Sequence, residues 1–274
     1  MAKGFDFGAN WERYSERALN EDRVVTARAA FSQLIEGIDL ESRTFLDVGF
    51  GQGLTSLCAA SAGASVHSLD VNPKCLDALK LTGKFFESSV REKLSLTTGS
   101  ILSEKIIVDL LGQSGGYHVV HAWGVLHHTG DLKQAFSNCV RLLAPRGYLI
   151  VAVYNRHWSS PLWKAIKRLY CALPTIGQKV LVGVLTPIIV LAKIVVRGKN
   201  PMDTQRGMDF FVDIVDWVGG YPYEYASIQE VSDLGAACGL DLMRVNPASV
   251  PTGCNEFIFF SSDSNRGISA ELNK

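Results

Sequence analysis

Short apolar runs alternate with helix-like stretches through much of this chain, from residue 43 to residue 153. The pattern predicts strands over residues 43–48, 65–70, 94–97, 117–122 and 147–153, and two more at 240–245 and 256–261. Strands that alternate with helices favour a parallel sheet with right-handed crossovers, because the crossover helices cover both of its faces. The hydrophobic pattern therefore predicts a doubly wound α/β fold.

Helical spacing marks the N-terminal segment, which we expect to be helical over residues 9–37. Trp11 and Tyr14 are spaced so that both rings lie on one face of this helix. A further helix is expected at Leu132–Leu143, and the sequence Ala-Pro-Arg-Gly at 144–147 should end it.

A glycine-rich turn follows the first predicted strand, in the sequence Phe-Leu-Asp-Val-Gly-Phe-Gly-Gln-Gly at 45–53. Glycines let a backbone bend sharply and approach a ligand closely. A dinucleotide fingerprint would place its third glycine one residue later, where this chain has Leu54. Asp47 at the mouth of the turn would repel a pyrophosphate and attract a cation. The turn therefore favours S-adenosylmethionine, which carries an ammonium and a sulfonium and no phosphate.

The second predicted strand, at 65–70, ends in Asp70. A carboxylate at this place can accept hydrogen bonds from both hydroxyls of a ribose. A glycine turn that binds no ligand is the alternative, because the glycine spacing alone is a weak signal. The combination of the turn with Asp47 and Asp70 favours the nucleoside ligand.

Three stretches of the sequence resemble the class I S-adenosylmethionine-dependent methyltransferases, and within them the small-molecule branch that includes ubiquinone-type methylases. They are 45–53 with Asp70, Thr98–Ile101 and Ala122–His128, and the likeness covers roughly residues 10–155. The resemblance implies a Rossmann-like sheet of seven strands in the order 3-2-1-4-5-7-6, with the last strand antiparallel. It also implies S-adenosylmethionine as the cofactor, bound at the carboxyl ends of the strands.

The resemblance further implies which residues hold the cofactor. Asp47 and the glycine turn would hold its methionine end, Asp70 its ribose, and Ser100 would lie near its adenine, unless Ser100 is an ordinary turn serine. Tyr14 would close the site if the N-terminal helix folds over the cofactor, or else simply pack that helix on the domain. The full set of expected cofactor contacts is Tyr14, Asp47, Gly49, Gly51, Gly53, Asp70, Val71, Asn72, Ser100, Ile101, Ala122 and Trp123.

Two adjacent histidines, His127 and His128, follow the fourth predicted strand and are the candidate catalytic residues. Transfer of an activated methyl group needs alignment and, for a hydroxyl acceptor, a base. The pKa of histidine suits that base, and His128 is the preferred candidate. The alternative is that one of the pair hydrogen-bonds to the backbone or caps the helix that begins near residues 129–131.

The kind of acceptor follows from what the sequence lacks after its fourth strand. No Asn-Pro-Pro-Tyr-like sequence occurs there, which argues against methylation of nucleobases and protein amides. A small-molecule acceptor methylated at oxygen is therefore expected first, and C-methylation of a quinone-like or lipid-linked acceptor second. A non-catalytic protein that binds S-adenosylmethionine or a membrane is a third hypothesis.

The segment from residue 156 to residue 239 is too long for a simple connection between strands. Its first part, from Arg156 to Met202, contains eight basic residues and no acidic one. It also contains the apolar run Val180–Val196, which is short for a membrane-spanning helix and interrupted by Pro187. We expect this part to be a hydrophobic lid or a homodimer contact, or to make peripheral membrane contact over 156–200.

The second part of this segment carries carboxylates and aromatic residues. Asp209, Asp213 and Asp216 recur at helical spacing, which is most often a solvated face. An aromatic, glycine-rich loop follows at 217–224, and it resembles, more weakly, a subgroup of bacterial methyltransferases associated with surface glycans or secondary metabolites. The residues expected to contact the acceptor are Tyr154, Arg156, Trp158, Asp213, Trp217, Tyr221 and Tyr223.

Composition limits the remaining possibilities. The 274 residues have a formal net charge of zero, so no overall basic field attracts nucleic acid. The six cysteines form neither a Cys-x-x-Cys pair nor a cluster with metal spacing, and the N-terminus carries no apolar signal segment. We therefore expect no metal, reduced thiols, a cytoplasmic monomer or homodimer, and at most an association with the inner membrane surface.

The expected organisation has five parts. N-terminal helices that cap the cofactor occupy residues 1–40, and the Rossmann-like core occupies 41–155. The inserted lid and acceptor-binding segment spans 156–239, the closing strands 240–262, and a disordered polar tail 263–274.

Overall fold

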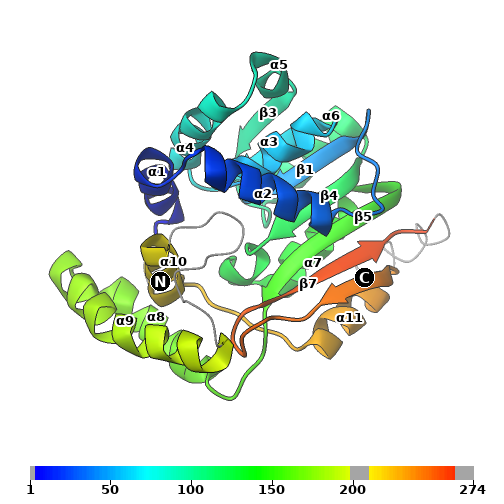
Figure 1. The fold of residues 1–274 in the computed structure, drawn as a ribbon. Helices are drawn as coiled ribbons and strands as arrows, with labels where there is room; N and C mark the ends of the chain where they lie inside the picture. The colour runs from blue at the N-terminus through cyan, green and yellow to red at the C-terminus, as the bar shows by residue number, and fades with distance from the viewer. Residues whose placement is uncertain (1–3, 198–209, 263–274) are drawn as a thin grey trace.

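A single sheet of seven strands organises residues 4–197 and 210–262, the parts of the chain that this computed structural model describes (Figure 1). The strands are β1 Thr44–Val48, β2 Ser65–Asp70, β3 Leu94–Thr98, β4 Tyr117–Trp123, β5 Leu143–Tyr154, β6 Asp241–Asn246 and β7 Cys254–Phe260. Their order is β3-β2-β1-β4-β5-β7-β6, and β7 is antiparallel to both of its neighbours. The fold, the strand order and the antiparallel last strand are all confirmed.

The helices lie between and around these strands (Figure 1). They are α1 Phe7–Arg17, α2 Glu21–Leu34, α3 Leu54–Ser61, α4 Lys74–Thr82, α5 Ser88–Arg91, α6 Glu104–Ser114, α7 Leu132–Arg141, α8 Ser160–Ala172, α9 Thr175–Arg197, α10 Phe210–Gly219 and α11 Ile228–Ala237, with short 3₁₀ turns η1 Gly83–Phe85 and η2 Leu126–His128.

Two boundaries differ from the sequence prediction, each for a local reason. The expected helix 9–37 is two helices, because Asn20 is extended and its side chain accepts the N–H of Arg23 to begin α2. The expected stop at 144–147 lies inside β5, which begins at Leu143. The pairing with β4 shifts register there, and Arg146 has a positive φ of 57°.

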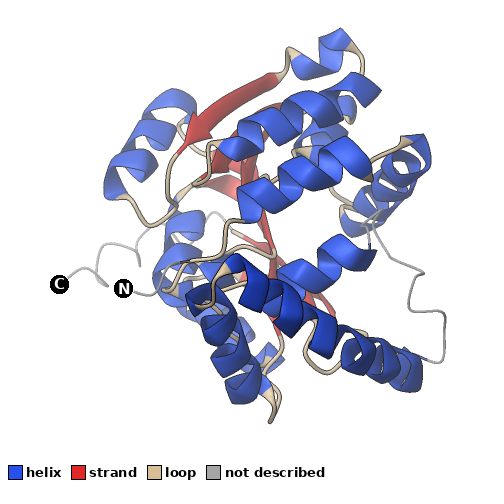
Figure 2. Cartoon of the chain, turned by 90° about the vertical axis from the view of Figure 1, so that its left-hand side faces the viewer, coloured by secondary structure: helices blue, strands red, loops and turns tan. Residues whose placement is uncertain are grey.

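The core fills both faces of the sheet, because alternate residues of each strand point to opposite sides. Phe45, Val119 and Ile150 pack under α2 and α3 on one face. Leu46, Val120 and the neighbouring strand residues pack under α6, α7 and α11 on the other. Figure 2 shows the strands seen close to edge-on between these helices.

The helices α8, α9 and α10 form a separate cluster beside the sheet. Tyr170, Ile189, Ile214 and Val218 are its buried centre. The helix α1 contacts both α4, next to the glycine turn, and α10 of this cluster. The N-terminal helix therefore lies between the two halves of the molecule (Figure 1).

Candidate active site

The turn between β1 and α3 requires its glycines. Gly49, Gly51 and Gly53 have φ values of 71°, 56° and 77°, a region that side-chain-bearing residues rarely adopt. A Cβ atom on Gly51 would lie 2.9 Å from the indole nitrogen of Trp11, and one on Gly49 would lie 2.3 Å from Val125. The turn is therefore a tight cradle at the carboxyl end of β1, as its spacing predicts.

Asp70 lies at the carboxyl end of β2, beside this turn. One of its carboxylate oxygens accepts the N–H of Gly51 at 3.0 Å, and the other accepts the N–H of Asn72 at 2.9 Å. Burial raises the pKa of Asp70 above its usual value. Each oxygen has a further lone pair, so the carboxylate can still accept hydrogen bonds from a pair of hydroxyls.

Asp47 is buried behind the turn. Its carboxylate accepts the hydroxyl of Ser56 on α3 at 2.6 Å and lies 2.8 Å from Nδ1 of His121 on β4. The negative charge therefore holds α3 and β4 to the strand that carries the glycines. A direct contact of Asp47 with the methionine end of a cofactor stays a prediction.

The helix α1 covers the cradle through Trp11. Its ring lies against Gly51, while Tyr14 is fully buried 6.1 Å from it and edge-on. Trp11 is the residue that the sequence reasoning left out of the cofactor set, although it lies on the same helix face as Tyr14. The structure thus brings the N-terminal helix to the glycine turn, as expected, but the ring that contacts the turn is that of Trp11 and not that of Tyr14.

The start of α1 is tied to the strand end that carries Asp70. Asp6 caps the helix by accepting the N–H of Ala9, and it also accepts bonds from Asn72 and Lys74, both at 2.7 Å. One residue earlier, the N–H of Phe5 donates to the carbonyl of Tyr221 at 2.9 Å. The N-terminal segment therefore bonds, within two consecutive residues, to the strand end that carries Asp70 and to the loop that follows α10.

The remaining expected cofactor residues divide by where their side chains lie. Val71 is exposed directly after β2. Ser100 accepts the N–H of Leu102 at 3.1 Å, which is the ordinary role of a turn serine. Ile101 and Ala122 are buried in the core, so only their backbone can face a ligand. Trp123 donates its indole N–H to Glu256 at 2.8 Å.

A backbone carbonyl fixes which ring nitrogen of His128 carries the proton. Its Nδ1 lies 2.6 Å from the carbonyl oxygen of Pro222, which can only accept, so Nδ1 carries the proton. Burial lowers the pKa of His128 to about 3. The ring is therefore neutral at physiological pH, with the lone pair on Nε2.

His127 is buried beneath its neighbour, with the two ring centroids 4.4 Å apart. Its Nδ1 accepts the N–H of Tyr154 at 3.4 Å, and its Nε2 has no hydrogen-bond partner among the residues that the structure describes. Burial holds its pKa well below the usual value. Both histidines thus bond to the backbone, which the sequence reasoning expected of one of them.

Three of the expected acceptor residues surround a buried lysine. The Nζ of Lys167 lies 4.6 Å from the ring centre of Trp217, 4.8 Å from that of Tyr223 and 5.6 Å from that of Tyr154. It also donates to the carbonyl of Trp217. Burial lowers the pKa of Lys167 to about 7. Lys167 is one of the eight basic residues of this segment, and α8 turns it inward.

This aromatic cluster adjoins the two histidines. The ring of Tyr154 lies 4.1 Å from that of His127 and 5.6 Å from that of His128. Together with the histidines of η2, its members come from β5, α8, α10 and the loop that follows α10. It is therefore assembled only by the tertiary fold.

The other expected acceptor residues lie apart from this cluster. Arg156 forms a two-nitrogen ion pair with Glu230 at 2.7 and 2.8 Å. Trp158 is 84% exposed and stacks only on its neighbour His157 among the ring contacts described. Tyr221 lines a surface pocket of about 290 Å³. Asp213 is half-buried on α10, and Asp209 lies outside the described residues.

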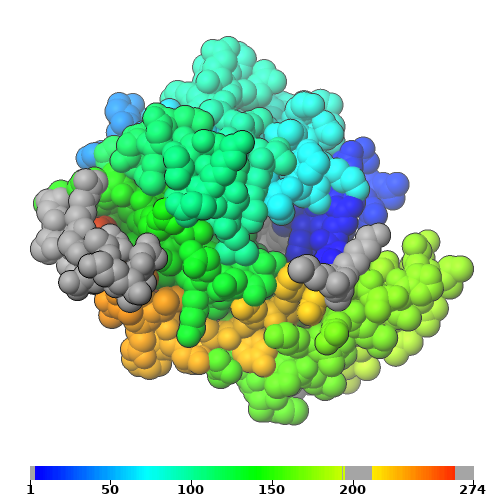
Figure 3. All heavy atoms as spheres, turned by 180° about the vertical axis from the view of Figure 1, so that it is seen from behind, coloured from blue at the N-terminus to red at the C-terminus, as the bar shows by residue number. Residues whose placement is uncertain are grey.

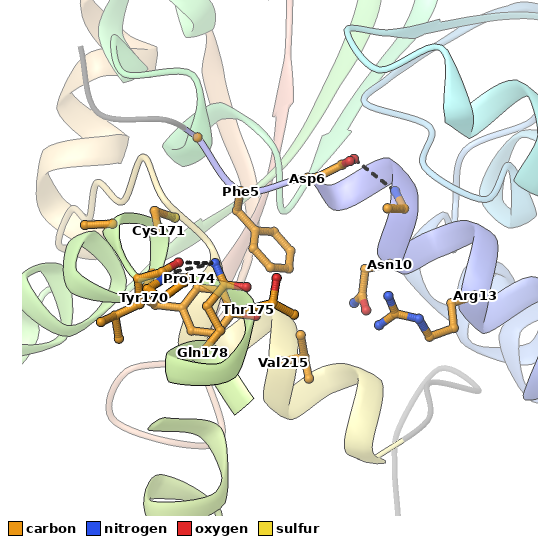
Figure 4. Close-up of a pocket in the computed structure, with 14 residues that line it drawn as sticks. Phe5, Asp6, Asn10, Arg13, Tyr170, Cys171, Pro174, Thr175, Gln178 and Val215 are labelled. Atoms are coloured by element: carbon orange, nitrogen blue, oxygen red, sulfur yellow. Dashed lines mark hydrogen bonds between the residues drawn. The ribbon is translucent and has the colours of Figure 1, made fainter. Parts of the chain in front are cut away.

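A cleft of about 660 Å³ opens between α1, the junction of α8 and α9, and α10 (Figure 4). None of the expected site residues lines it. Asn10 donates to Asp216 at 2.7 Å at its wall. Phe5 also lines it, and the ring of Phe7 lies 4.7 Å from those of both Phe5 and His128. Phe5 and Phe7 therefore lie between the cleft and the ring of His128.

The residues at the carboxyl ends of β1 and β2 fit S-adenosylmethionine. The glycines let the turn pack closely against its neighbours, Asp70 offers oxygens to a ribose, and the third glycine lies one residue earlier than in a pyrophosphate site. Within the described residues, no group of three or more His, Cys, Asp or Glu side chains could hold a metal ion.

Comparisons with known proteins agree with this geometry. Residues 46–149 match a family model described as a methyltransferase domain. Magnesium protoporphyrin IX methyltransferase from Synechocystis PCC 6803, with bound S-adenosylhomocysteine, has a similar fold at a TM-score of 0.57 and 16% identity, covering 93% of this chain and 94% of that one. Residues 46–149 are therefore similar to methyltransferase domains, and the chain is similar in fold to a solved methyltransferase with bound S-adenosylhomocysteine.

In sequence, the chain is similar to ubiquinone biosynthesis O-methyltransferases. It is 32% identical to that of Xanthomonas oryzae pv. oryzae (strain PXO99A) over 119 residues, which are 43% of this chain and 46% of the relative. It is 31% identical to that of Bordetella avium (strain 197N) over 127 residues, 46% and 49% of the two chains. The chain thus spans about half the length of the curated relatives it matches.

Proposed function

We propose that this protein methylates an ionisable oxygen of a small-molecule acceptor, with His128 as the base. The observation that carries the proposal is the bond between Nδ1 of His128 and the carbonyl of Pro222. It fixes the tautomer in which Nε2 can take a proton, which is the geometric requirement for a general base.

The cofactor, when bound, supplies a methyl group that is already activated on a sulfonium. Asp70 and the glycine turn would hold and orient it, and Trp11 would exclude water from above the turn. Nε2 of His128 would take the hydroxyl proton as the acceptor oxygen forms its bond to the methyl carbon and the carbon–sulfur bond breaks. The products are a methyl ether and S-adenosylhomocysteine.

The low pKa of His128 limits the kinds of acceptor hydroxyl that it can deprotonate. A nitrogen whose pKa is about 3 is a weak base, so it can assist only a hydroxyl that is itself fairly acidic. The positive charge of Lys167, beside the Tyr154 ring, favours negative charge in the same region. A phenol-like or enol-like acceptor fits both conditions.

The comparisons support oxygen as the methylated atom, since the matched relatives are named O-methyltransferases. C-methylation of a quinone-like or lipid-linked acceptor is the second candidate, because a carbon acceptor next to an ionised hydroxyl would use the same base. The position of the methyl group in the product, read by NMR, distinguishes them.

The test begins with calorimetric titration of S-adenosylmethionine and S-adenosylhomocysteine. A screen of phenols, enols and lipid-linked glycans follows, in which methyl transfer is read by mass spectrometry. With an acceptor in hand, His128→Gln should lower kcat by about 100-fold or more and leave cofactor affinity unchanged. The matched control is His157→Gln, which changes a histidine that bonds to Ser159 outside the site.

The pH profile gives a second readout. Because the pKa of His128 is lowered to about 3, its protonation should cause no loss of kcat/KM between pH 8 and about pH 5. If His128→Gln kept the wild-type rate, His128 would not be the general base. Failure of well-folded protein to bind either cofactor form would remove the methyltransferase proposal.

A further inference from the structure

The helix α9 presents a long apolar face that nothing in the described structure covers. Its large apolar side chains recur every three or four residues and are between 57 and 78% exposed. These residues, the outer face of α9, are Ile176, Val180, Val184, Ile188 and Leu191. The adjacent helix α8 adds Leu162 and Leu169, both more than half exposed. Figure 3 shows α8 and α9 projecting from the body at the lower right.

The opposite face of α9 is packed along its length. Ile189 is buried, and Leu181, Leu185 and Val190 lie against the core of the α8–α10 cluster. Thr175–Ala192 is long and apolar enough to cross a membrane by length and composition, although only 6% of it is buried. Because the inner face is held against α8 and α10, the arrangement fits a helix that lies along a surface.

The positive charge of this segment indicates which kind of partner the face binds. Residues 156–202 contain no acidic side chain, and Lys164, Arg168 and Lys179 are exposed on α8 and α9. Two copies of the chain that paired through this face would bring these cations together with no carboxylate of the segment between them. A surface of anionic lipid headgroups complements both the apolar stripe and the cations.

We propose that the outer face of α9 lies flat in the interface of a bilayer that contains anionic lipids. The apolar stripe enters the boundary between headgroups and acyl chains. Lys179, next to the stripe on α9, meets lipid phosphates, and Lys164 and Arg168 on α8 add to the attraction at longer range. This binding is independent of methyl transfer, because no residue that holds the cofactor or bonds to His128 takes part.

The test is co-sedimentation of the full chain with phosphatidylcholine vesicles, with and without phosphatidylglycerol, at low and high salt. We expect binding to the anionic vesicles that weakens with salt. The double variant Val184→Asp/Ile188→Asp should lower vesicle affinity by at least about tenfold, because it places two charges in the apolar stripe. The matched control is Val25→Asp/Val108→Asp, at positions 65% and 56% exposed on α2 and α6.

A second pair of variants tests the electrostatic part. Lys164→Gln/Lys179→Gln should reduce binding to anionic vesicles and flatten its salt dependence, with cofactor affinity unchanged. Titration of each variant with S-adenosylhomocysteine checks that the domain is folded, and keeps this proposal separate from the methyltransferase activity.

Three outcomes would overturn the proposal. They are no vesicle binding by wild-type protein, equal binding to neutral and anionic vesicles, or equal loss in the control double variant. A concentration-dependent dimer in light scattering that Val184→Asp/Ile188→Asp dissociates would also overturn it, since the face would then bind a second copy.

Discussion

The cofactor side and the acceptor side of this molecule are built in different ways. The cofactor side consists of two adjacent strand ends and one turn, and its main contacts are backbone N–H groups placed by glycines and by Asp70. The acceptor side consists of side chains from η2, β5, α8, α10 and the loop after α10. One side is a property of local chain geometry, and the other is a property of tertiary packing.

This difference predicts how each side responds to change. A contact made through backbone geometry fails when one glycine or one carboxylate is replaced, because nothing nearby can take over. A packed cluster shares its contacts among many rings and charges, so single replacements there should act mainly through burial and charge.

Asp70→Ala should weaken binding of S-adenosylmethionine by at least about 100-fold. The variant removes two charged hydrogen bonds to ribose, each contributing about 1.5–3 kcal/mol, and also the acceptor that holds the N–H of Gly51. Calorimetry measures the loss. Asp77→Ala is the control, because that exposed carboxylate pairs only with Lys80 on α4. Equal effects of the two substitutions would contradict the assignment of Asp70.

Gly51→Ala should cost more than Gly124→Ala, although both glycines have positive φ. Each substitution forces alanine into a left-handed conformation at about 1–2 kcal/mol. Only at Gly51 does the added Cβ also meet Trp11, while nothing lies within 4 Å at Gly124. We expect Gly51→Ala to lose about 1–2 kcal/mol more in the free energy of unfolding, and to bind the cofactor less tightly. If urea denaturation gave equal losses in the free energy of unfolding for the two variants, Trp11 would not be packed against the glycine turn.

Asp216→Asn should stabilise the protein at alkaline pH. Burial raises the pKa of Asp216 from its usual 3.8 to about 7, so its contribution to stability is fully present below about pH 4 and is lost as pH rises from there through 7. Asparagine keeps an acceptor for the bond from Asn10 and carries no charge.

The expected gain grows between about pH 4 and pH 7 and is then constant, so it is larger at pH 8.5 than at pH 5 by at least about 1 kcal/mol, read from thermal unfolding. Asp109→Asn, on an exposed face of α6, is the control and should change nothing at either pH. A loss of stability at pH 8.5 would mean that the cluster needs the ionised carboxylate beside Lys167.

Arg156→Gln should have the smallest effect, below about 1 kcal/mol, because its ion pair with Glu230 is half-exposed. We also expect an unchanged KM for the acceptor, since the guanidinium is engaged away from the histidines. A raised KM with unchanged stability would instead extend the acceptor side to Arg156, as the sequence reasoning had it.

The same distinction explains what the sequence could predict. Strand order, the glycine turn and the position of Asp70 follow from short spacings and alternating apolar runs, which a sequence displays directly. The break at Asn20 was missed because a cap depends on one backbone conformation. The burial of Lys167 was missed because it depends on how α8 packs against α10, which composition does not encode.

The cleft beside α1 was missed for a related reason. Its lining comes from the N-terminal segment, the α8–α9 junction and α10, none of which carries a motif. Trp11 lay within reach of sequence reasoning, because it shares a helix face with Tyr14, but only the close approach at Gly51 distinguishes the two rings.

The double attachment of the N-terminal segment has a kinetic consequence. Asp6 is bonded to Asn72 and Lys74 at the ribose end, and Phe5 is bonded to Tyr221 beside the histidines. A segment held in this way cannot move aside for the acceptor without loosening its hold on the cofactor. Turnover should therefore follow a compulsory order, with S-adenosylmethionine first on and S-adenosylhomocysteine last off. S-adenosylhomocysteine would then inhibit competitively against S-adenosylmethionine and noncompetitively against the acceptor.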